Sequence, residues 1–456
     1  MPGGLLQAQL SVLRAAASDV WQGRWPKSYA FTFVAELGVL LGGLVTLKIA
    51  GDMLGPTGFG EYAVARRAVS VLTFPLLLGL GISIPRYVSL TVASDPSGKT
   101  AAAYSLASLC IGVPLVTTFG LAGLIAPTWF ARLFYGDPRF GFLTGPILLA
   151  ISGLYAHTLV YANFRGRLRM WPANLLQLGN LALAPAVAVL TSRGNAAGAI
   201  RVTGIVWLVT SAATASWSVL RRGFQAPPGA VLRKATLDLL TFGAPRVVGE
   251  FALFGFFALP TFYVAHTVGV EGAGLFSFAL SLVQVLSSMF AAVGILLLPY
   301  ISRQVATGSW ERIGNVVSKS LAASLLVTLF AVAVLELMMG SLIPWVMGRT
   351  FAPAVVPARW LVAGALPFVA YTLLRDPLDA IAVWPYNTIN LGVTLLGVMA
   401  ALWFGNVWFS PAPAVALGML LLGALTVLAW RRALGSARAG PGALVGTVGG
   451  GSELGV

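Results

Sequence analysis

The segment W-P-A-N-L-L-Q-L-G at residues 171–179 returns as W-P-Y-N-T-I-N-L-G at residues 384–392, a shift of 213 positions. Matches at a shift of 214 keep the same order along the chain: Val34-Ala35-Glu36 with Val248-Gly249-Glu250, Gly55, Gly58 and Gly60 with Gly269, Gly272 and Gly274, Pro85 with Pro299, and Ala156, Thr158 and Leu159 with Ala370, Thr372 and Leu373. An ordered repeat of this length predicts two similar halves with a site between them.

The composition places both halves in a membrane. Hydrophobic residues make up 58% of the chain, charged residues make up 9%, and the mean hydropathy is +0.87. A soluble domain has about a quarter charged residues, so this chain cannot cover itself for water. Apolar stretches near the roughly 20 residues that cross a bilayer recur throughout. The predicted fold class is therefore an all-α polytopic membrane protein.

Few residues are available for disulfides or metals. Cys110 is the one cysteine, and His157 and His266 are too few for a metal site without many carboxylates. A net charge of +15 would suggest nucleic acid in a soluble protein. In a membrane protein it indicates basic cytoplasmic loops that touch anionic lipid, so membrane lipids are expected partners and nucleic acid is not.

We predict about twelve spanning helices. They are expected at 29–52, 62–90, 100–126, 140–164, 171–191, 197–220, 238–265, 274–300, 315–345, 352–375, 383–405 and 412–430. Six helices per half give both halves the same orientation, so the repeat axis should run along the membrane normal.

The predicted domains follow from these spans. The two six-helix lobes occupy 29–220 and 238–431, joined by a cytoplasmic linker at 221–237. The segment 1–28 shows no removable signal peptide and could form a cytoplasmic interfacial helix, and 432–456 is expected to be a flexible cytoplasmic tail. No connecting loop is long enough to fold as a soluble domain, which argues against membrane glycosyltransferases and polymerases.

The distribution of basic residues indicates the orientation. With both termini in the cytoplasm, about nineteen of the 29 lysines and arginines lie in inner segments and about five in outer loops. We therefore expect both termini to be cytoplasmic.

Six ionisable residues fall inside predicted spans: Glu36, Arg66, Arg67, Arg246, Glu250 and Glu336. Each would cost about 2.5–3.5 kcal/mol near the bilayer centre, so such residues usually face a wet cavity or pair within the bundle. Glu36 and Glu250 match each other in the repeat, which favours a shared cavity. The alternative is structural, with Arg246 and Glu250 paired one turn apart. Glu336 has no acidic counterpart and is left unassigned.

A polar stripe in the eighth span orients the arginines of the second span. The stripe consists of Ser277, Ser281, Gln284 and Ser288, which recur at helical spacing. At the shift of 214, these residues match Ala63, Arg67, Ser70 and Phe74 in that order. If the halves pack symmetrically, Arg67 and Ser70 face the same cavity as Gln284, and Arg66 lies on its flank. Packing of small residues between helices is the alternative for the serines.

Arginines in a cavity imply an anionic substrate. A guanidinium is permanently charged and matches phosphate with two parallel hydrogen bonds, which suits a pyrophosphate head group. The candidate substrate-binding residues are therefore Arg67, Arg66, Arg246, Glu36, Glu250, Ser70 and Gln284. The glutamates could balance the arginines in the empty site or bind a coupling cation, Na⁺ or H⁺. No catalytic residue and no cofactor is expected. The glycines of 55–60 lack the lysine and the strand of a phosphate-binding loop, so the sequence does not support direct ATP drive.

The repeated W-P segments open the fifth and eleventh spans, where proline suits a first turn and tryptophan suits the membrane interface. Their amide side chains are Asn174, Gln177, Asn387 and Asn390. These could contact a polar substrate, but hydrogen bonds between helices are the favoured interpretation.

The stretch L-G-P-T-G-F-G-E-Y at 54–62, followed by a long apolar helix and by residues 79–87, resembles the opening of Wzx-type polysaccharide flippases. These belong to the multidrug/oligosaccharidyl-lipid/polysaccharide (MOP) superfamily. The resemblance implies a V-shaped, MATE-like pair of lobes, with helices one, two, seven and eight lining a cationic cavity. It also implies that an undecaprenyl-diphosphate-linked oligosaccharide crosses the bacterial inner membrane by alternating access, with a glycan polymerase and glycosyltransferases as further partners.

Two other functions stay open. A cation-coupled multidrug or small-molecule exporter of the same superfamily would lose resistance to cationic compounds on charge reversal at Arg67 or Arg246, whereas a flippase would lose glycan export. A membrane glycan polymerase would instead depend on residues of an outer loop, such as Arg132 or Arg139.

Overall fold

The computed structural model describes residues 27–94, 99–222, 227–306, 309–382, 384–405 and 410–438. Within these ranges the chain is helical and has no strand. The elements are α2 (Lys27–Leu76), α3 (Leu80–Ser94), α4 (Lys99–Ile125), α5 (Pro127–Tyr135), η1 (Pro138–Leu143), α6 (Thr144–Gly166), α7 (Met170–Gln177), η2 (Leu178–Leu183), α8 (Ala184–Thr191), α9 (Ala196–Arg222), α10 (Gly229–Gly243), η3 (Ala244–Arg246), α11 (Val247–Thr267), α12 (Val270–Ala306), α13 (Trp310–Met347), η4 (Arg349–Ala354), α14 (Val355–Ile381), α15 (Tyr386–Phe404) and α16 (Pro411–Arg438).

Eleven helices among the described residues are long and apolar enough to cross a membrane. The first of them, α2, contains two spans, because Gly55 leaves the helical conformation with a φ of 65°. Leu47 and Tyr62, from either side of Gly55, line one cavity, so the two arms of α2 lie side by side. Gly269, the repeat counterpart of Gly55, also has a positive φ, of 101°. The all-α polytopic architecture expected from the sequence is thus confirmed.

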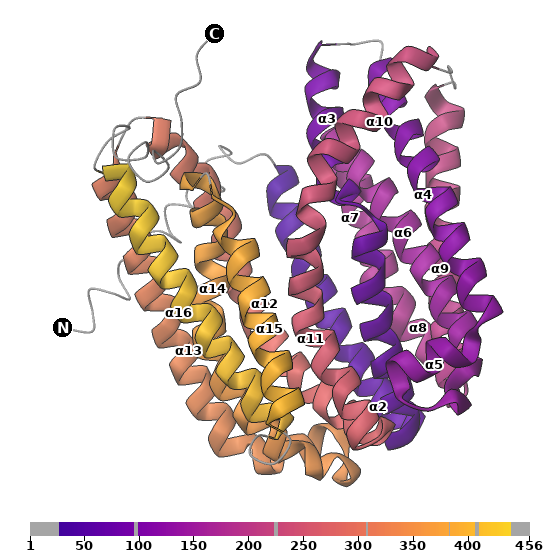
Figure 1. Ribbon diagram of the computed structural model, residues 1–456, viewed down its shortest axis with the longest axis vertical. Coiled ribbons are helices and arrows are strands. Elements are labelled where there is room, and N and C mark those ends of the chain that lie inside the picture. The colour runs from indigo at the N-terminus through magenta and orange to yellow at the C-terminus, as the bar shows by residue number, and fades with distance from the viewer. Residues whose placement is uncertain are drawn as a thin grey trace.

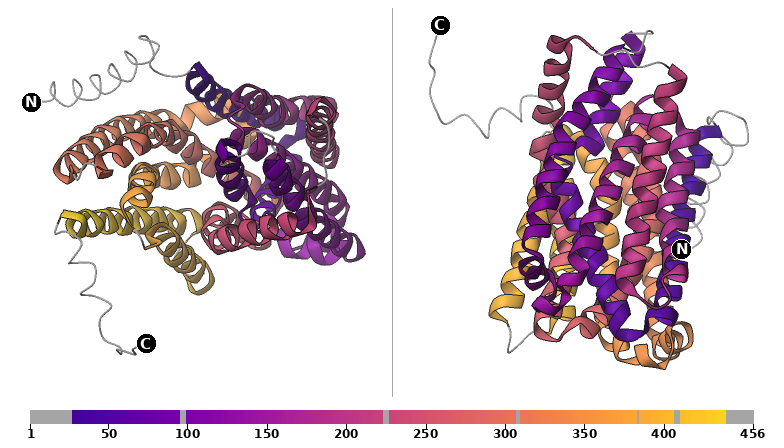
Figure 2. Two further views of the ribbon diagram at one scale, coloured as in Figure 1. Left: turned by 90° about the horizontal axis from the view of Figure 1, so that it is seen from above. Right: turned by 90° about the vertical axis from the view of Figure 1, so that its right-hand side faces the viewer.

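Two groups of helices make two lobes. Figure 1 shows the helices α2–α9 (the N-lobe) on the right and α11–α16 (the C-lobe) on the left, diverging towards the top of the view, and Figure 2 shows them side by side from above. One hydrophobic core runs through both lobes. A second core, which includes Leu297, Ile313 and Trp430, belongs to the C-lobe alone. The lobes therefore share packing at one end and separate at the other.

The shared end carries five of the six glycines with a positive φ among the described residues, and we call it the glycine-turn end. Positive φ angles occur there at Gly55, Gly136, Gly194, Gly269 and Gly348, each in a connection between helices. Only glycine adopts this conformation without strain, so these positions allow short connections. The other end, which carries Ser94, Arg222 and Arg438, is called the opposite end.

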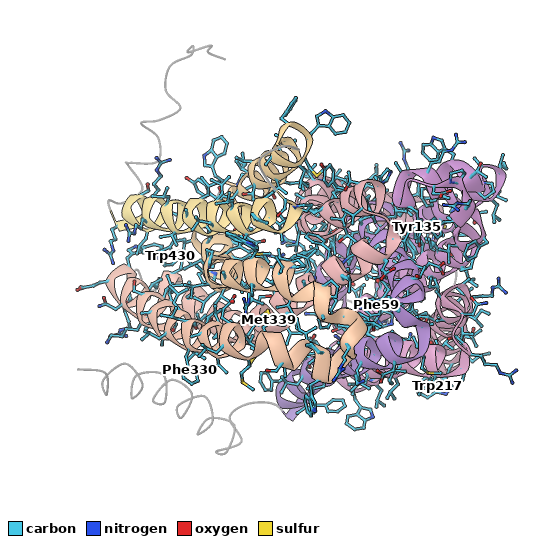
Figure 3. The ribbon with its side chains drawn as sticks, turned by 90° about the horizontal axis from the view of Figure 1, so that it is seen from below. Phe59, Tyr135, Trp217, Phe330, Met339 and Trp430 are labelled. Carbon is cyan, nitrogen blue, oxygen red and sulfur yellow. The ribbon has the colours of Figure 1, made fainter. Side chains whose placement is uncertain are left out.

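The lobes approach each other closely where the second arm of α2 crosses α12. A Cβ atom on Gly60 would lie 2.1 Å from the Val270 carbonyl oxygen, and one on Gly274 would lie 2.7 Å from the Gly60 Cα. Gly60 and Gly274 are counterparts in the repeat, so the two-fold pseudo-axis passes between them. The Phe59 and Phe351 rings, with centroids 5.1 Å apart, pack beside the crossing, and Phe59 lies where the lobes meet in Figure 3.

Helix α10 packs with the N-lobe although it belongs to the second half of the sequence. The Tyr104 hydroxyl of α4 donates to Asp238 Oδ2 at 2.7 Å, and the backbone of Gly79 touches that of Gly243. Residues 229–237, predicted as part of the linker, are helical. The chain passes to the C-lobe at the short 3₁₀ turn η3, which contains Pro245.

Large apolar side chains cover the outer surface, as a bilayer requires. Phe330 of α13 is 71% exposed and Leu337 is 86% exposed, and Figure 3 shows Phe330 and Trp217 at the periphery. Glu336 lies on the same helix, where the Arg359 Nε atom of α14 is 3.7 Å from its Oε2. Glu336 and Arg359 therefore form an ion pair between α13 and α14, which accounts for the glutamate left unassigned from the sequence.

Gly60→Ala should disturb the crossing. The added methyl group has no room beside a backbone oxygen, so α2 and α12 must separate, and we expect a loss of about 1–3 kcal/mol. The thermal unfolding midpoint of the purified protein in detergent should fall by several degrees. Gly120→Ala is the control, because a Cβ there meets nothing within 4 Å. Equal midpoints for both variants would contradict the role given to the crossing.

Candidate functional site

A cavity of about 50 Å³ lies between the lobes beside the α2–α12 crossing. Its lining comes from both arms of α2 and from α12: Leu47, Tyr62, Ala63, Arg66, Arg67, Ser70, Ser277, Ser281 and Gln284. The volume leaves room for a few water molecules and for nothing larger. In this conformation the cavity is therefore too small for a diphosphate head group.

Arg67 reaches from the N-lobe to the C-lobe across this cavity. Its Nε donates to Ser277 Oγ at 3.3 Å, and its Nη1 donates to Gln284 Oε1 at 3.0 Å. Its guanidinium carbon lies 5.9 Å from the centroid of the Phe257 ring on α11. All of these partners are neutral and belong to the C-lobe, so none of them offsets the positive charge of the Arg67 guanidinium.

Helical spacing explains how the side chains meet. Arg67 follows Gly60 by two turns on the same face of α2, and Ser277, Ser281 and Gln284 continue the face of α12 that carries Gly274. Because the two glycines fix a close crossing, these faces stay within side-chain reach of each other.

Arg66 and Ser70 complete the N-lobe side. Arg66 is exposed, and its guanidinium carbon lies 5.7 Å from the Tyr62 ring centroid. The Ser70 hydroxyl donates to the Arg66 carbonyl oxygen at 3.0 Å. In the described part of the chain, the ion pairs within 4.0 Å are Lys48–Asp52, Arg139–Asp137 and Arg359–Glu336. Neither cavity arginine is therefore neutralised by a carboxylate at that distance.

Glu36 lies outside the cavity, on the first arm of α2. Gln177 Nε2 donates to Glu36 Oε1 at 3.1 Å, and Asn174 Nδ2 donates to Thr32 Oγ1 at 3.0 Å. At 1.5 Å per residue, Glu36 is about 10 Å further than Arg67 from the turn at Gly55. The amides of this W-P segment thus bond neighbouring helices, as the favoured interpretation expects.

Arg246 also lies outside the cavity, towards the opposite end. It sits in η3, where its guanidinium carbon lies 3.7 Å from the Phe242 ring centroid and its Nη1 donates to the Phe242 carbonyl oxygen. Arg86 of α3 approaches the same ring, with its guanidinium carbon 4.5 Å from the centroid. The pairing of Arg246 with Glu250 one turn away is not formed within 4.0 Å in the described residues.

Glu250 joins charged residues that sequence reasoning missed. Arg375 of α14 and Arg246 are the cations whose charges act on it. Asp376 and Asp379 lie on the same stretch of α14, and Asn387 Nδ2 donates to Asp379 Oδ1 at 2.7 Å. The sequence feature that could have revealed this charged cluster is the run R-D-P-L-D at 375–379. It was missed because the predicted span ended at 375, whereas α14 continues to Ile381.

The seven predicted site residues therefore fall into two groups, four that line the cavity and three that do not. Arg66, Arg67, Ser70 and Gln284 surround one cavity. Glu36, Glu250 and Arg246 are not among its lining residues, because they lie further along their helices. The role of all seven residues in substrate binding stays a prediction.

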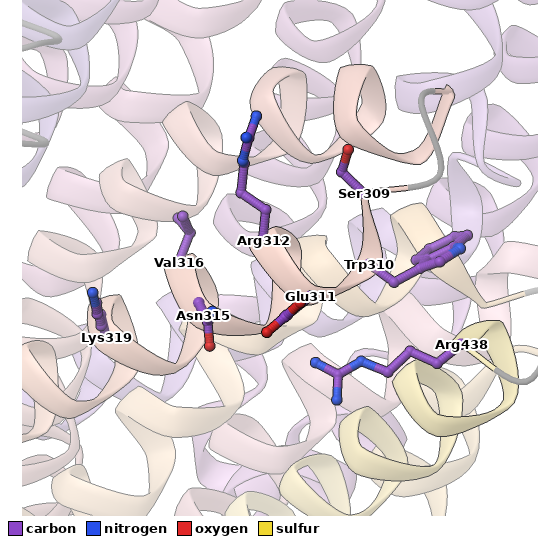
Figure 4. A pocket seen from close by; sticks show the side chains of 8 residues that line it. All are labelled: Ser309, Trp310, Glu311, Arg312, Asn315, Val316, Lys319 and Arg438. Atoms are coloured by element: carbon purple, nitrogen blue, oxygen red, sulfur yellow. The ribbon is translucent and has the colours of Figure 1, made fainter.

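A larger cavity, of about 770 Å³, opens on the surface of the C-lobe at the opposite end. Figure 4 shows its lining side chains, which come from the start of α13 and the end of α16: Ser309, Trp310, Glu311, Arg312, Asn315, Val316, Lys319 and Arg438. Three cations and one carboxylate make this groove basic. It is separate from the interface between the lobes.

Two repeated helical lobes around a central interface are the architecture of a multi-pass membrane transporter. Solved structures with this fold cover most of the chain: an inward-facing multidrug resistance MATE family transporter of the MOP superfamily (TM-score 0.65, 15% identity, 92% of this chain and 96% of that one); the eukaryotic MATE transporter AtDTX14 (0.62, 12%, 91% and 98%); and the Vibrio cholerae MATE transporter VcmN in its bent form (0.60, 16%, 91% and 98%). They confirm the predicted MATE-like fold.

A family model described as polysaccharide biosynthesis protein matches residues 27–305, more than half of the chain. The chain belongs to this family. No curated protein matches it. The resemblance to Wzx-type flippases is thus confirmed at the level of family and fold.

A double-mutant cycle should detect the bond between the lobes. Arg67→Met and Gln284→Leu each remove the hydrogen bond, so their effects on the free energy of unfolding should be non-additive by about 1 kcal/mol. Unfolding in mixed detergent micelles measures this. Arg67→Met combined with Ser70→Ala is the control, because the Ser70 hydroxyl bonds its own helix. Additive effects of Arg67→Met and Gln284→Leu would contradict the bond.

Proposed function

We propose that the protein is a flippase for an undecaprenyl-diphosphate-linked oligosaccharide, which it moves from the inner to the outer leaflet of the bacterial cytoplasmic membrane. One observation carries this proposal. Arg67 and Arg66 bring two positive charges to the interface of the lobes, with no carboxylate within 4.0 Å among the described residues. Family membership and the transporter fold support it.

The charge at the interface favours an anion. Two guanidiniums at the interface raise the cost of a cationic ligand and lower that of a phosphate. Each guanidinium can offer a diphosphate two parallel hydrogen bonds. Ser277 and Gln284, which hold Arg67 here, supply weaker neutral acceptors. A diphosphate would therefore displace them.

Displacement of these partners links binding to lobe motion. The bonds from Arg67 to α12 join the lobes in this conformation, so a ligand that captures the guanidinium weakens the contact. A ligand shifts a conformational equilibrium only through contacts that differ between the states. In our proposal the opposite end faces the cytoplasm, the head group enters where the lobes diverge, and the prenyl chain stays in lipid. Rocking of the lobes then exposes the head group to the other side.

Reversal of the Arg67 charge is the central test. Arg67→Glu should reduce flipping of a fluorescent undecaprenyl-diphosphate glycan in proteoliposomes at least tenfold, because a charge-assisted bond contributes about 1.5–3 kcal/mol. Arg67→Lys should retain part of the activity, since it keeps the charge but loses the planar fork. Arg139→Gln is the control, because Arg139 pairs with Asp137 in a connecting segment.

The same variants separate the alternatives. If Arg67→Glu leaves glycan flipping intact and instead abolishes cellular resistance to cationic compounds, the protein is a multidrug exporter. If Arg139→Gln stops polymer formation while lipid-linked units still reach the outer leaflet, a polymerase role gains support.

The proposal includes a driving ion and partners. We propose coupling to Na⁺ or H⁺, which imposed ion gradients in the same proteoliposomes would distinguish. Glycosyltransferases would supply the substrate and a polymerase would consume the product, so their genes beside this one would support glycan export. Anionic lipids are proposed to contact the basic groove of Figure 4, whose lining includes Trp310, Arg312 and Lys319.

A further inference from the structure

At the opposite end, two arginines from different elements approach one aromatic ring. The Arg86 guanidinium carbon of α3 lies 4.5 Å from the centroid of the Phe242 ring on α10. The Arg246 guanidinium carbon of η3 lies 3.7 Å from the same centroid. Because both distances end at one ring, the two guanidiniums are neighbours, and we call them the Arg86–Arg246 pair.

Contacts within the N-lobe hold the Phe242 ring in place. The Tyr87 ring packs edge to face against it, with centroids 5.9 Å apart, and stacks on the Tyr104 ring at 5.3 Å. The Tyr104 hydroxyl donates to Asp238, one turn before Phe242 on α10. The ring is half-buried, whereas both arginines are exposed. A fixed ring that attracts two guanidiniums through its faces holds them in position on the surface.

Most of the hydrogen-bond donors of the pair have no protein acceptor. A guanidinium has five N–H donors. Arg246 gives one of them to the Phe242 carbonyl oxygen, and the Arg86 side chain bonds no acceptor among the described residues. Within that part of the chain, neither arginine has a carboxylate within 4.0 Å. Two like charges are thus held side by side with donors available to an anionic ligand.

The electrostatic surroundings place the pair between the lobes. The charge of Arg246 acts on Glu250 and on Asp379 of α14, and both carboxylates also interact with the charge of Arg375. Arg246 is therefore near the C-lobe, while the ring beneath it packs on the N-lobe. Figure 1 shows α3 and α10 at the top of the N-lobe, at the end where the lobes diverge.

The pair is separate from the cavity of Arg67. Arg86 follows Arg67 by nineteen residues, a helical rise of about 28 Å along α2 and α3. One diphosphate group cannot contact both arginines at this distance. A ligand that enters from the opposite end meets the Arg86–Arg246 pair first and the cavity arginines afterwards.

We propose that the Arg86–Arg246 pair is a docking site for the diphosphate group of the lipid-linked substrate, at the mouth between the lobes. The inference rests on the proposed function, because the ligand is its substrate and the mouth is its entrance. Two neighbouring guanidiniums match the two phosphates of a diphosphate, and each offers two parallel hydrogen bonds. Because the ring holds the guanidiniums in advance, binding costs less conformational entropy.

Binding of undecaprenyl diphosphate without a glycan to the full-length protein in detergent tests the site directly. Arg86→Gln combined with Arg246→Gln should raise the dissociation constant at least tenfold, since charge-assisted contacts to both phosphates are lost. Phe242→Leu should raise it several-fold although it removes no charge. Arg233→Gln combined with Lys234→Gln is the matched control, because both side chains are exposed on α10, and it should bind as the parent does.

Two other ligands show which source of phosphate the site prefers. Undecaprenyl monophosphate should bind several-fold more weakly than the diphosphate, because it engages one guanidinium at a time. Inorganic pyrophosphate should compete only at much higher concentration, because it lacks the prenyl chain that stays in lipid. Pyrophosphate that binds as tightly as the lipid would make this a site for a free anion and overturn the proposal.

The substitutions also give clear negative outcomes. Unchanged diphosphate binding in the variant that lacks both arginines overturns the proposal, and so does an equal loss in the α10 control, which indicates a general effect of charge. Thermal unfolding midpoints identify a variant that fails to fold. In that case Arg86→Gln alone decides, because this exposed side chain bonds no described residue and its loss should still weaken binding several-fold.

Flipping kinetics separate this inference from the proposed function. In proteoliposomes, loss of the Arg86–Arg246 pair should raise the substrate fraction at half-maximal rate about tenfold and keep the maximal rate, whereas Arg67→Glu should lower the maximal rate. Flipping that needs Arg67 but not the pair overturns the docking site and leaves the flippase proposal intact. Diphosphate binding that needs the pair, in a protein that flips no glycan, overturns the flippase proposal and leaves the docking site.

Discussion

The close crossing of α2 and α12 at Gly60 and Gly274 is the constraint on which the rest of the structure depends. In a bilayer, helices gain little from burying apolar surface against each other, so small residues that admit close backbone contact decide where they associate. The absence of side chains at this point sets the separation of the lobes. It also places Arg67 and Gln284, further along the same faces, within hydrogen-bond distance.

The repeat makes the frame symmetric but cannot make the site symmetric. A residue near the pseudo-axis lies close to its own counterpart, so a charge duplicated there would face a like charge. Arg67 accordingly has Ser281 as its counterpart, and Gln284 has Ser70. Further from the axis, matching residues can both be charged: Glu36 bonds Gln177, whereas its counterpart Glu250 lies near Arg375. The repeated helices are thus arranged symmetrically, whereas the charged and polar residues of the cavity are not repeated.

The two ends of the interface are held by different forces. At the glycine-turn end, aromatic packing of Phe59 on Phe351 and the contact of His266 with the Arg132 carbonyl oxygen join the lobes. At the opposite end the C-lobe has its own hydrophobic core, and α10 packs on the N-lobe instead. The seventh span therefore contacts both lobes, with η3 between its parts. In the proposed mechanism, rocking of the lobes changes one end while the packing within each lobe is kept.

The all-helical membrane fold, the parallel repeat and the shared face of Arg67 and Gln284 could be predicted from the residues alone, because bilayer thickness and helical periodicity are local rules. The packing of the helices was needed to show that Glu36, Glu250 and Arg246 lie outside the cavity of Arg67 and that α10 packs with the N-lobe. Periodicity gives the direction of a side chain around its helix, but the packing of helices sets its depth. The contact between His266 and Arg132 was also hidden, because the partner at Arg132 is a backbone oxygen, which residue type does not reveal.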